Sequence, residues 1–182
     1  MNKGKNAIFK FCLSAMLIAL NIVLERLLAF TVGNQQIGFS FLPIAFAAVY
    51  LGPIYALGVS VIGDILGTVL LSTQGAFFPG FTVTAAITGL CTGLFLYKKA
   101  TAPRIILNVL CNFVFGSVLL NTFWLSEFFI KAPYLTILIS RIPQFIIMPI
   151  IHILVNMLVF WIKSPVRKTL DREVGRIFNR LG

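Results

Sequence analysis

The amino-acid sequence predicts an all-α membrane protein with six transmembrane helices and both termini in the cytoplasm. Of the 182 residues, 59% are hydrophobic and only 11% are charged. The mean hydropathy is +0.98. These values lie outside the range of soluble domains. The helices are therefore expected to lie in a lipid bilayer.

Apolar runs define the expected helices. Five runs approach or exceed the roughly 20 residues that a spanning helix needs. They are Phe11–Phe30, Ile54–Leu71, Phe81–Tyr97, Ile105–Leu125 and Leu135–Ile162, and Phe39–Leu51 is a sixth, shorter run. The first run follows basic residues, as in a signal peptide, but it is too long and no small-residue cleavage site follows it. We therefore expect it to be retained as the first helix.

The distribution of basic residues indicates whether the short run also crosses the membrane. Of the 15 Lys and Arg, three precede the first run, three lie between 97 and 105, and six follow the last run. These twelve share one side only if the chain crosses six times, and the positive-inside rule makes that side the cytoplasm. The loops 31–38, 72–80 and 126–134 then face outward. The net charge of +10 is explained by orientation and contact with membrane lipid, so no nucleic-acid partner is expected.

The chain divides into a membrane domain, 1–163, and a cytoplasmic segment, 164–182. The segment begins with Ser164 as an N-cap and Pro165 in the first turn. Its apolar residues fall on one helical face, and they are Leu170, Val174, Ile177, Phe178 and Leu181. This pattern predicts a basic amphipathic helix on the inner membrane surface.

Four charged residues lie inside the apolar runs: Glu25, Arg26, Asp64 and Arg141. Glu25 and Arg26 are neighbours and point about 100° apart on a helix, so each needs its own partner. At roughly 1.5 Å per residue, all four lie about 8 to 11 Å below the outer helix ends. Because charges within a membrane are costly, they indicate either a polar pocket open to the outside or an ion-pair network that holds helices together.

Aromatic and amide residues are expected at the same depth. Those singled out are Gln36, Phe39, Phe77, Phe81, Asn121 and Trp124. Aromatic faces with a few amides and charges suit a flat heteroaromatic ligand with polar edges. An interfacial aromatic belt would use the same residue types without binding a ligand.

Catalytic and metal-binding motifs are absent from the sequence. It contains no G-x-x-x-x-G-K-[ST], no H-E-x-x-H and no paired-aspartate metal motif, so ATP hydrolysis by this chain is excluded and no cofactor or metal is expected. Cys12, Cys91 and Cys111 lie in apolar runs without metal spacing and are expected to pack. The sole histidine, His152, is expected to pack as well.

Two small residues on the first helix, Ala15 and Ala19, form a small-x-x-x-small ridge. Such a ridge lets another helix approach closely. With this ridge, "LGPIYALGVSVIGDILG", "FFPGFTVTAAITGL", "LNTFWL" and "RIPQ" resemble the folate subgroup of the substrate-binding S components of energy-coupling factor transporters. The resemblance covers nearly the whole chain. It implies a vitamin-capturing subunit of the bacterial plasma membrane that joins a transmembrane coupling subunit, through the ridge, and two cytosolic ATPases.

Folate would explain the charges within the apolar runs. Its pterin edge offers adjacent N–H donors that suit Glu25 or Asp64, while its anionic tail or its O4 edge suits Arg26 or Arg141. Phe81 or Trp124 would stack on the ring. The full set of expected ligand residues is Glu25, Arg26, Gln36, Phe39, Asp64, Phe77, Phe81, Thr82, Asn121, Trp124, Arg141 and Gln144.

Three other functions remain open. An S component for a thiamin precursor or a queuosine precursor would use a similar pocket, although only folate needs a spare arginine. A small membrane-embedded enzyme would use Glu25, Asp64 and Arg141 as acid, base and anion clamp. A structural assembly subunit would bind no soluble ligand.

Overall fold

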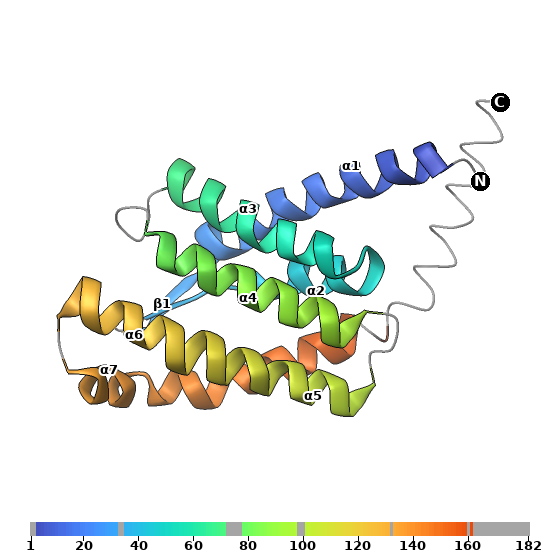
Figure 1. Cartoon of the computed structure of the whole chain (residues 1–182). Coiled ribbons are helices and arrows are strands. Elements are labelled where there is room, and N and C mark those ends of the chain that lie inside the picture. The colour runs from blue at the N-terminus through green and yellow to red at the C-terminus, as the bar shows by residue number, and fades with distance from the viewer. Residues whose placement is uncertain are drawn as a thin grey trace.

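The computed structural model describes residues 3–32, 35–71, 78–97, 101–131, 133–159 and 161. The predicted amphipathic helix 164–182 and Phe77 lie outside these residues. Helices run side by side through the molecule, with α4 between α3 on one side and the long helix of α5 and α6 on the other (Figure 1). The described part of the chain is helical apart from one short hairpin.

The helical segments follow one another with short connections. They are α1 Lys3–Ile22, η1 Val23–Leu27, α2 Phe41–Tyr50, α3 Pro53–Leu71, α4 Pro79–Leu96, α5 Ala102–Cys111, η2 Asn112–Asn121, α6 Thr122–Trp124, η3 Leu125–Ile130, α7 Tyr134–Ser140 and a last helix, Ile142–Val159. The segments η1, η2 and η3 are π-helical and continue the α-helices that precede them.

Among the described residues, five helices are long and apolar enough to cross a membrane. They are Ala7–Leu27, Pro53–Leu71, Pro79–Leu96, Ala102–Phe128 and Ile142–Val159. The sixth predicted run forms α2, which has 10 residues. Gly52 follows α2 with a φ of 111°, and Pro53 then begins α3. Glycine after a helix end and proline in a first turn are the usual choices at such a junction.

Two boundaries differ from the sequence prediction. The run Leu135–Ile162 is interrupted at Arg141, which separates α7 from the last helix. Pro143 accounts for the interruption, because proline lacks a backbone N–H and its ring clashes with the preceding turn. The expected outward loop 31–38 instead contains an antiparallel hairpin of β1 Phe30–Val32 and β2 Gln35–Ile37, so the first helix ends before Phe30. The β-branched residues in these strands favour extended structure.

The close approach of α3 and α4 determines how the core is built. A methyl group at Gly89 would lie 2.8 Å from the Ala56 carbonyl oxygen, and one at Gly93 would collide with the Pro53 backbone. The Ser60 hydroxyl also donates a hydrogen bond of 2.7 Å to the Ala85 carbonyl oxygen. Small residues at these positions therefore let two helices pack at backbone distance.

A cysteine pair allows the packing of α4 against α5 to be tested. The Sγ atoms of Cys91 and Cys111 lie 3.8 Å apart, and both cysteines are free. In a Cys12→Ser background, we expect mild copper-phenanthroline oxidation to join them, because a small movement brings the sulfur atoms to bonding distance. Mass spectrometry of the intact protein should show the loss of two hydrogens. Full alkylation of both thiols after oxidation would contradict the arrangement of α4 and α5.

Candidate ligand-binding site

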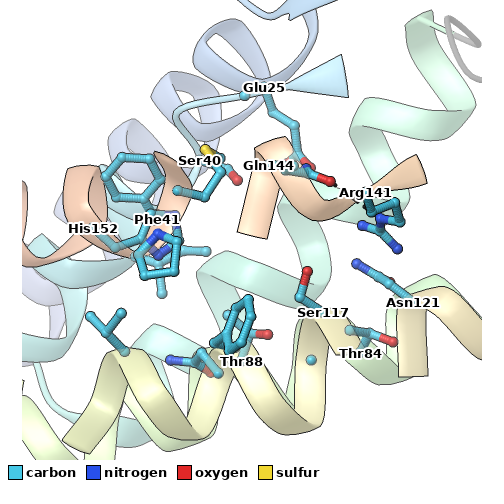
Figure 2. A pocket seen from close by; sticks show the side chains of 18 residues that line it. Glu25, Ser40, Phe41, Thr84, Thr88, Ser117, Asn121, Arg141, Gln144 and His152 are labelled. Atoms are coloured by element: carbon cyan, nitrogen blue, oxygen red, sulfur yellow. Dashed lines mark hydrogen bonds between the residues drawn. The ribbon is translucent and has the colours of Figure 1, made fainter. Parts of the chain in front are cut away.

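A cavity of about 210 Å³ lies among the helices (Figure 2). Its walls come from the end of the first helix, the start of α2, the middle of α4, the π-helical segment η2 and the last helix. Of the residues predicted from sequence to bind a ligand, Glu25, Asn121, Arg141 and Gln144 line it. The cavity therefore combines residues that are separated by more than a hundred positions in the sequence.

Arg141 is a buried cation on the cavity wall, with 4% of its surface exposed. Its Nη1 donates a hydrogen bond of 3.2 Å to the Thr122 hydroxyl, and its Nε donates one of 3.2 Å to Gln144 Oε1. Within the described part of the chain, no carboxylate lies at ion-pair distance from it. A buried charge is costly without a counter-ion. The arrangement therefore suits a ligand with an anionic group.

Glu25 also lines the cavity, and its carboxyl group lies close to the Ser40 side chain. Gly38 packs directly on this residue, because a methyl group there would lie 3.2 Å from the Glu25 Cα. Figure 2 shows the Glu25 side chain pointing toward Gln144 and Arg141. Its carboxylate thus offers hydrogen-bond acceptors to a ligand with N–H donors.

Arg26 and Asp64 do not line the cavity. The Arg26 Nη2 lies 3.7 Å from Asp64 Oδ1, and these side chains are 3% and 13% exposed. Arg26 also donates a hydrogen bond of 2.7 Å to the Thr68 hydroxyl, and Thr82 donates one of 2.8 Å to Asp64 Oδ2. These contacts join η1, α3 and α4. The four charges therefore have two kinds of surroundings: Arg26 and Asp64 form an ion pair, while Glu25 and Arg141 face the cavity.

The aromatic residues expected to stack on a ligand lie outside this cavity. The Trp124 ring packs against Phe78 at 5.5 Å and Phe128 at 5.9 Å between centroids, and Phe81 packs against Phe78 at 5.8 Å. They form an aromatic cluster at one end of α4 and α6. Phe39 contacts the lining residue Phe41, with ring centroids 6.1 Å apart. The Gln36 backbone pairs with Thr31 in the hairpin, and its side chain lies outside the described part.

Sequence reasoning missed the polar residues on one cavity wall. Those on α4 and η2 are Thr84, Thr88, Asn112 and Ser117. Asn112 and Asn121 are nine positions apart, and at about 100° per residue an α-helix would place them on opposite sides. The π-helical bonding of η2, from each residue to the fifth along, widens the turn and brings both to one side. Only the helix type, which the apolar pattern does not reveal, could have identified this wall.

His152 was expected to pack, and its ring does lie 3.9 Å from the Phe41 ring between centroids. It also lines the cavity, as does Phe41. Phe113 is a third cavity-lining ring. A histidine within an apolar run is the signal that could have indicated this end of the cavity, because buried polar rings need partners.

The ridge residues Ala15 and Ala19 are both exposed on α1. Large apolar side chains beside them are also exposed, with Phe11 at 73% and Met16 at 70%. The ridge is therefore not buried against the described part of the chain. It is available to another helix or to lipid.

Comparisons with known proteins agree with these features. The family model described as "ECF transporter, substrate-specific component" matches residues 10–160. The folate transporter FolT of Clostridium novyi (strain NT) is 34% identical over 137 residues, which are 75% of this chain and 79% of that protein. FolT of Leuconostoc mesenteroides subsp. mesenteroides is 36% identical over 120 residues, covering 64% of this chain and 63% of that protein.

A solved structure is also similar to this fold. It is described as FolT bound with folic acid, and it matches with a TM-score of 0.74 at 29% identity, covering 81% of this chain and 89% of that chain. The matched family region contains the five long apolar helices almost completely, as expected of a multi-pass protein of the cell membrane. On these grounds the chain belongs to the substrate-specific components of ECF transporters.

Proposed function

We propose that this protein captures folate, or a related pterin, from the outside of the cell and presents it for ATP-driven uptake by an associated transport module. The observation that carries the proposal is that the cavity is lined both by Arg141, which is buried and without a carboxylate partner in the described residues, and by Glu25. Folate pairs an anionic tail with a ring edge rich in N–H donors. The similarity to proteins named folate transporters supports this ligand.

The proposed ligand residues are those of the expected set that line the cavity. Arg141 holds the anionic tail and Glu25 accepts hydrogen bonds from the pterin, while Asn121 and Gln144 bind polar groups through their amides. Arg26, Asp64 and Thr82 hold η1, α3 and α4 in position. The contributions of Gln36 and Phe77 stay predictions.

The chain crosses the membrane six times in this proposal, with α2 as the short sixth span and both termini in the cytoplasm. The even count follows from the distribution of basic residues. A cysteine introduced at Thr73 should react with a membrane-impermeant maleimide on intact cells, and one introduced at Thr101 should not. Both single cysteines would be placed in a chain whose native cysteines are replaced by serine, and the reverse labelling pattern would contradict this topology.

The proposed partners are a transmembrane coupling subunit and two cytosolic ATPase subunits. The exposed ridge of Ala15 and Ala19 gives the coupling subunit a surface for close helix packing. Because the chain itself carries no ATP-binding motif, the energy for uptake comes from the ATPases.

The other possible functions are less well supported. An enzyme using Glu25, Asp64 and Arg141 together would need all three at one cavity, whereas Asp64 lies outside it and pairs with Arg26. Precursors of thiamin or queuosine would leave Arg141 without an anionic partner. A structural subunit would not need a cavity with two charged walls.

Direct titration tests the proposed function. The purified protein, in detergent or nanodiscs, should bind folate with one site per chain by isothermal titration calorimetry. Thiamin, which lacks an anionic tail, serves as the comparison ligand and should bind far more weakly. Absence of measurable folate binding by a well-folded protein would overturn the assignment.

A further inference from the structure

The cavity has two chemically different ends. Arg141, in the turn just before the last helix, and His152, on that helix, both line it. They are eleven residues apart, which corresponds to roughly 16 Å along a helix at 1.5 Å per residue. Arg141, Gln144 and Asn121 lie toward one end, and His152 with Phe41 lies toward the other (Figure 2). An elongated ligand with one charged and one aromatic end therefore has one orientation that matches both.

His152 is the polar group at the aromatic end. Its ring contacts that of Phe41, at 3.9 Å between centroids and 32° between planes, and it forms no hydrogen bond with the described residues. A neutral imidazole has one N–H donor and one acceptor. Leaving both without partners in a membrane interior is costly. The ring nitrogens are thus available to whatever fills the cavity.

Ser40 connects this end to Glu25. It precedes Phe41 at the start of α2 and lines the cavity close to the Glu25 carboxyl group. A flat ring lying against Phe41 and His152 would therefore have an imidazole at one edge and the Ser40 hydroxyl near another (Figure 2). These two groups can together supply the acceptors and the donor that a pterin edge requires.

We infer that His152 is a specificity-determining residue that hydrogen-bonds the ring edge of the ligand, with the ring against Phe41 and the anionic tail directed toward Arg141. This inference rests on the proposed function and goes beyond it by fixing the orientation of the ligand. His152 thus selects for a heteroaromatic ring with both donors and acceptors. Arg141 selects for the charge at the opposite end.

Binding at the two ends of the cavity can be tested separately with three ligands. They are folate, a pterin without the tail, and p-aminobenzoyl-glutamate, which is the tail without the pterin. His152→Phe keeps an aromatic ring beside Phe41 but removes both hydrogen-bonding groups. It should weaken folate and pterin binding at least about 10-fold and leave the affinity for p-aminobenzoyl-glutamate unchanged. His152→Gln keeps a donor and an acceptor, so it should lose less affinity for folate and pterin.

The matched control is Ile150→Phe on the same helix, because Ile150 is 55% exposed and does not line the cavity. It should bind all three ligands like the wild type. Calorimetry would be carried out on variants whose helicity and melting temperature match the wild type. If His152→Phe does not fold, the ratio of pterin to p-aminobenzoyl-glutamate affinity in His152→Gln gives the answer.

The outcomes distinguish this inference from the proposed function. If the wild type does not bind folate, the proposed function fails. If the wild type binds folate and His152→Phe binds it equally well, the histidine only packs and this inference alone is overturned. Equal loss of affinity for the pterin and for p-aminobenzoyl-glutamate would also overturn it, because the defect would then not be confined to the ring end.

Discussion

Replacing Arg141 with alanine is expected to weaken folate binding about 30-fold or more. Loss of a desolvated charge partner typically costs about 2 to 5 kcal/mol, and Arg141 is buried on the cavity wall without a carboxylate partner among the described residues. A neutral pterin without the glutamate tail should lose much less affinity. Calorimetric titration of the purified variant with both ligands measures the difference.

Two further variants make this experiment decisive. Glu25→Ala should weaken the binding of folate and of the pterin without the tail to a similar extent, because the carboxylate accepts hydrogen bonds from the ring that both ligands contain. Arg26→Ala is the matched structural control, since Arg26 is equally buried but pairs with Asp64 outside the cavity. Breaking such a pair is expected to destabilise the fold by about 3 to 5 kcal/mol and so to lower the melting temperature.

Protein yield and helicity must be compared before any affinity is interpreted, because removal of a charge within the membrane can unfold the protein. Unchanged folate affinity in well-folded Arg141→Ala and Glu25→Ala variants would contradict their role in binding. Both residues would then belong with Arg26 and Asp64 to a structural network.

The second large effect is expected at the exposed ridge of α1. Ala15→Trp or Ala19→Trp should abolish folate uptake by cells while leaving folate binding by the purified subunit intact. Both alanines are exposed, so tryptophan fits on the isolated subunit, but its bulk keeps a closely packed partner helix away. Uptake of labelled folate and calorimetry of the purified variant measure the two properties separately.

Ile146→Trp is the control for this experiment, because Ile146 is 62% exposed and lies on the last helix rather than on α1. It adds the same bulk at an exposed position outside the ridge and should leave uptake near the wild-type level. If the ridge variants lost folate binding as severely as uptake, the ridge would have an internal role and the coupling interface would lie elsewhere.

The sequence by itself determined where the long apolar helices lie. Apolar runs of spanning length are recognisable without any tertiary information, because the bilayer sets the length that each must have. Each of the five long helices and α2 overlaps one predicted run, with ends that differ by a few residues at most places. The charged residues were likewise recognisable as important, since a charge in an apolar run must find a partner or a function.

Only the tertiary structure decided what each charge does. Glu25 and Arg26 are adjacent in sequence, yet one faces the cavity while the other pairs with Asp64 and Thr68 on α3. Depth in the membrane, which the sequence supplies, was the same for both. The direction in which each side chain points depends on the π-helical turn η1 and on which neighbouring helix packs against it.

The remaining cavity residues were decided in the same way. Asn112, Ser117 and Asn121 share a wall because η2 is π-helical, and Phe41 meets His152 because α2 and the last helix pack together around the cavity. Hydropathy reports how apolar a segment is and not which helix it contacts. Since α-helical and π-helical turns can carry the same apolar residues, the choice between them rests on packing that forms only when the helices assemble.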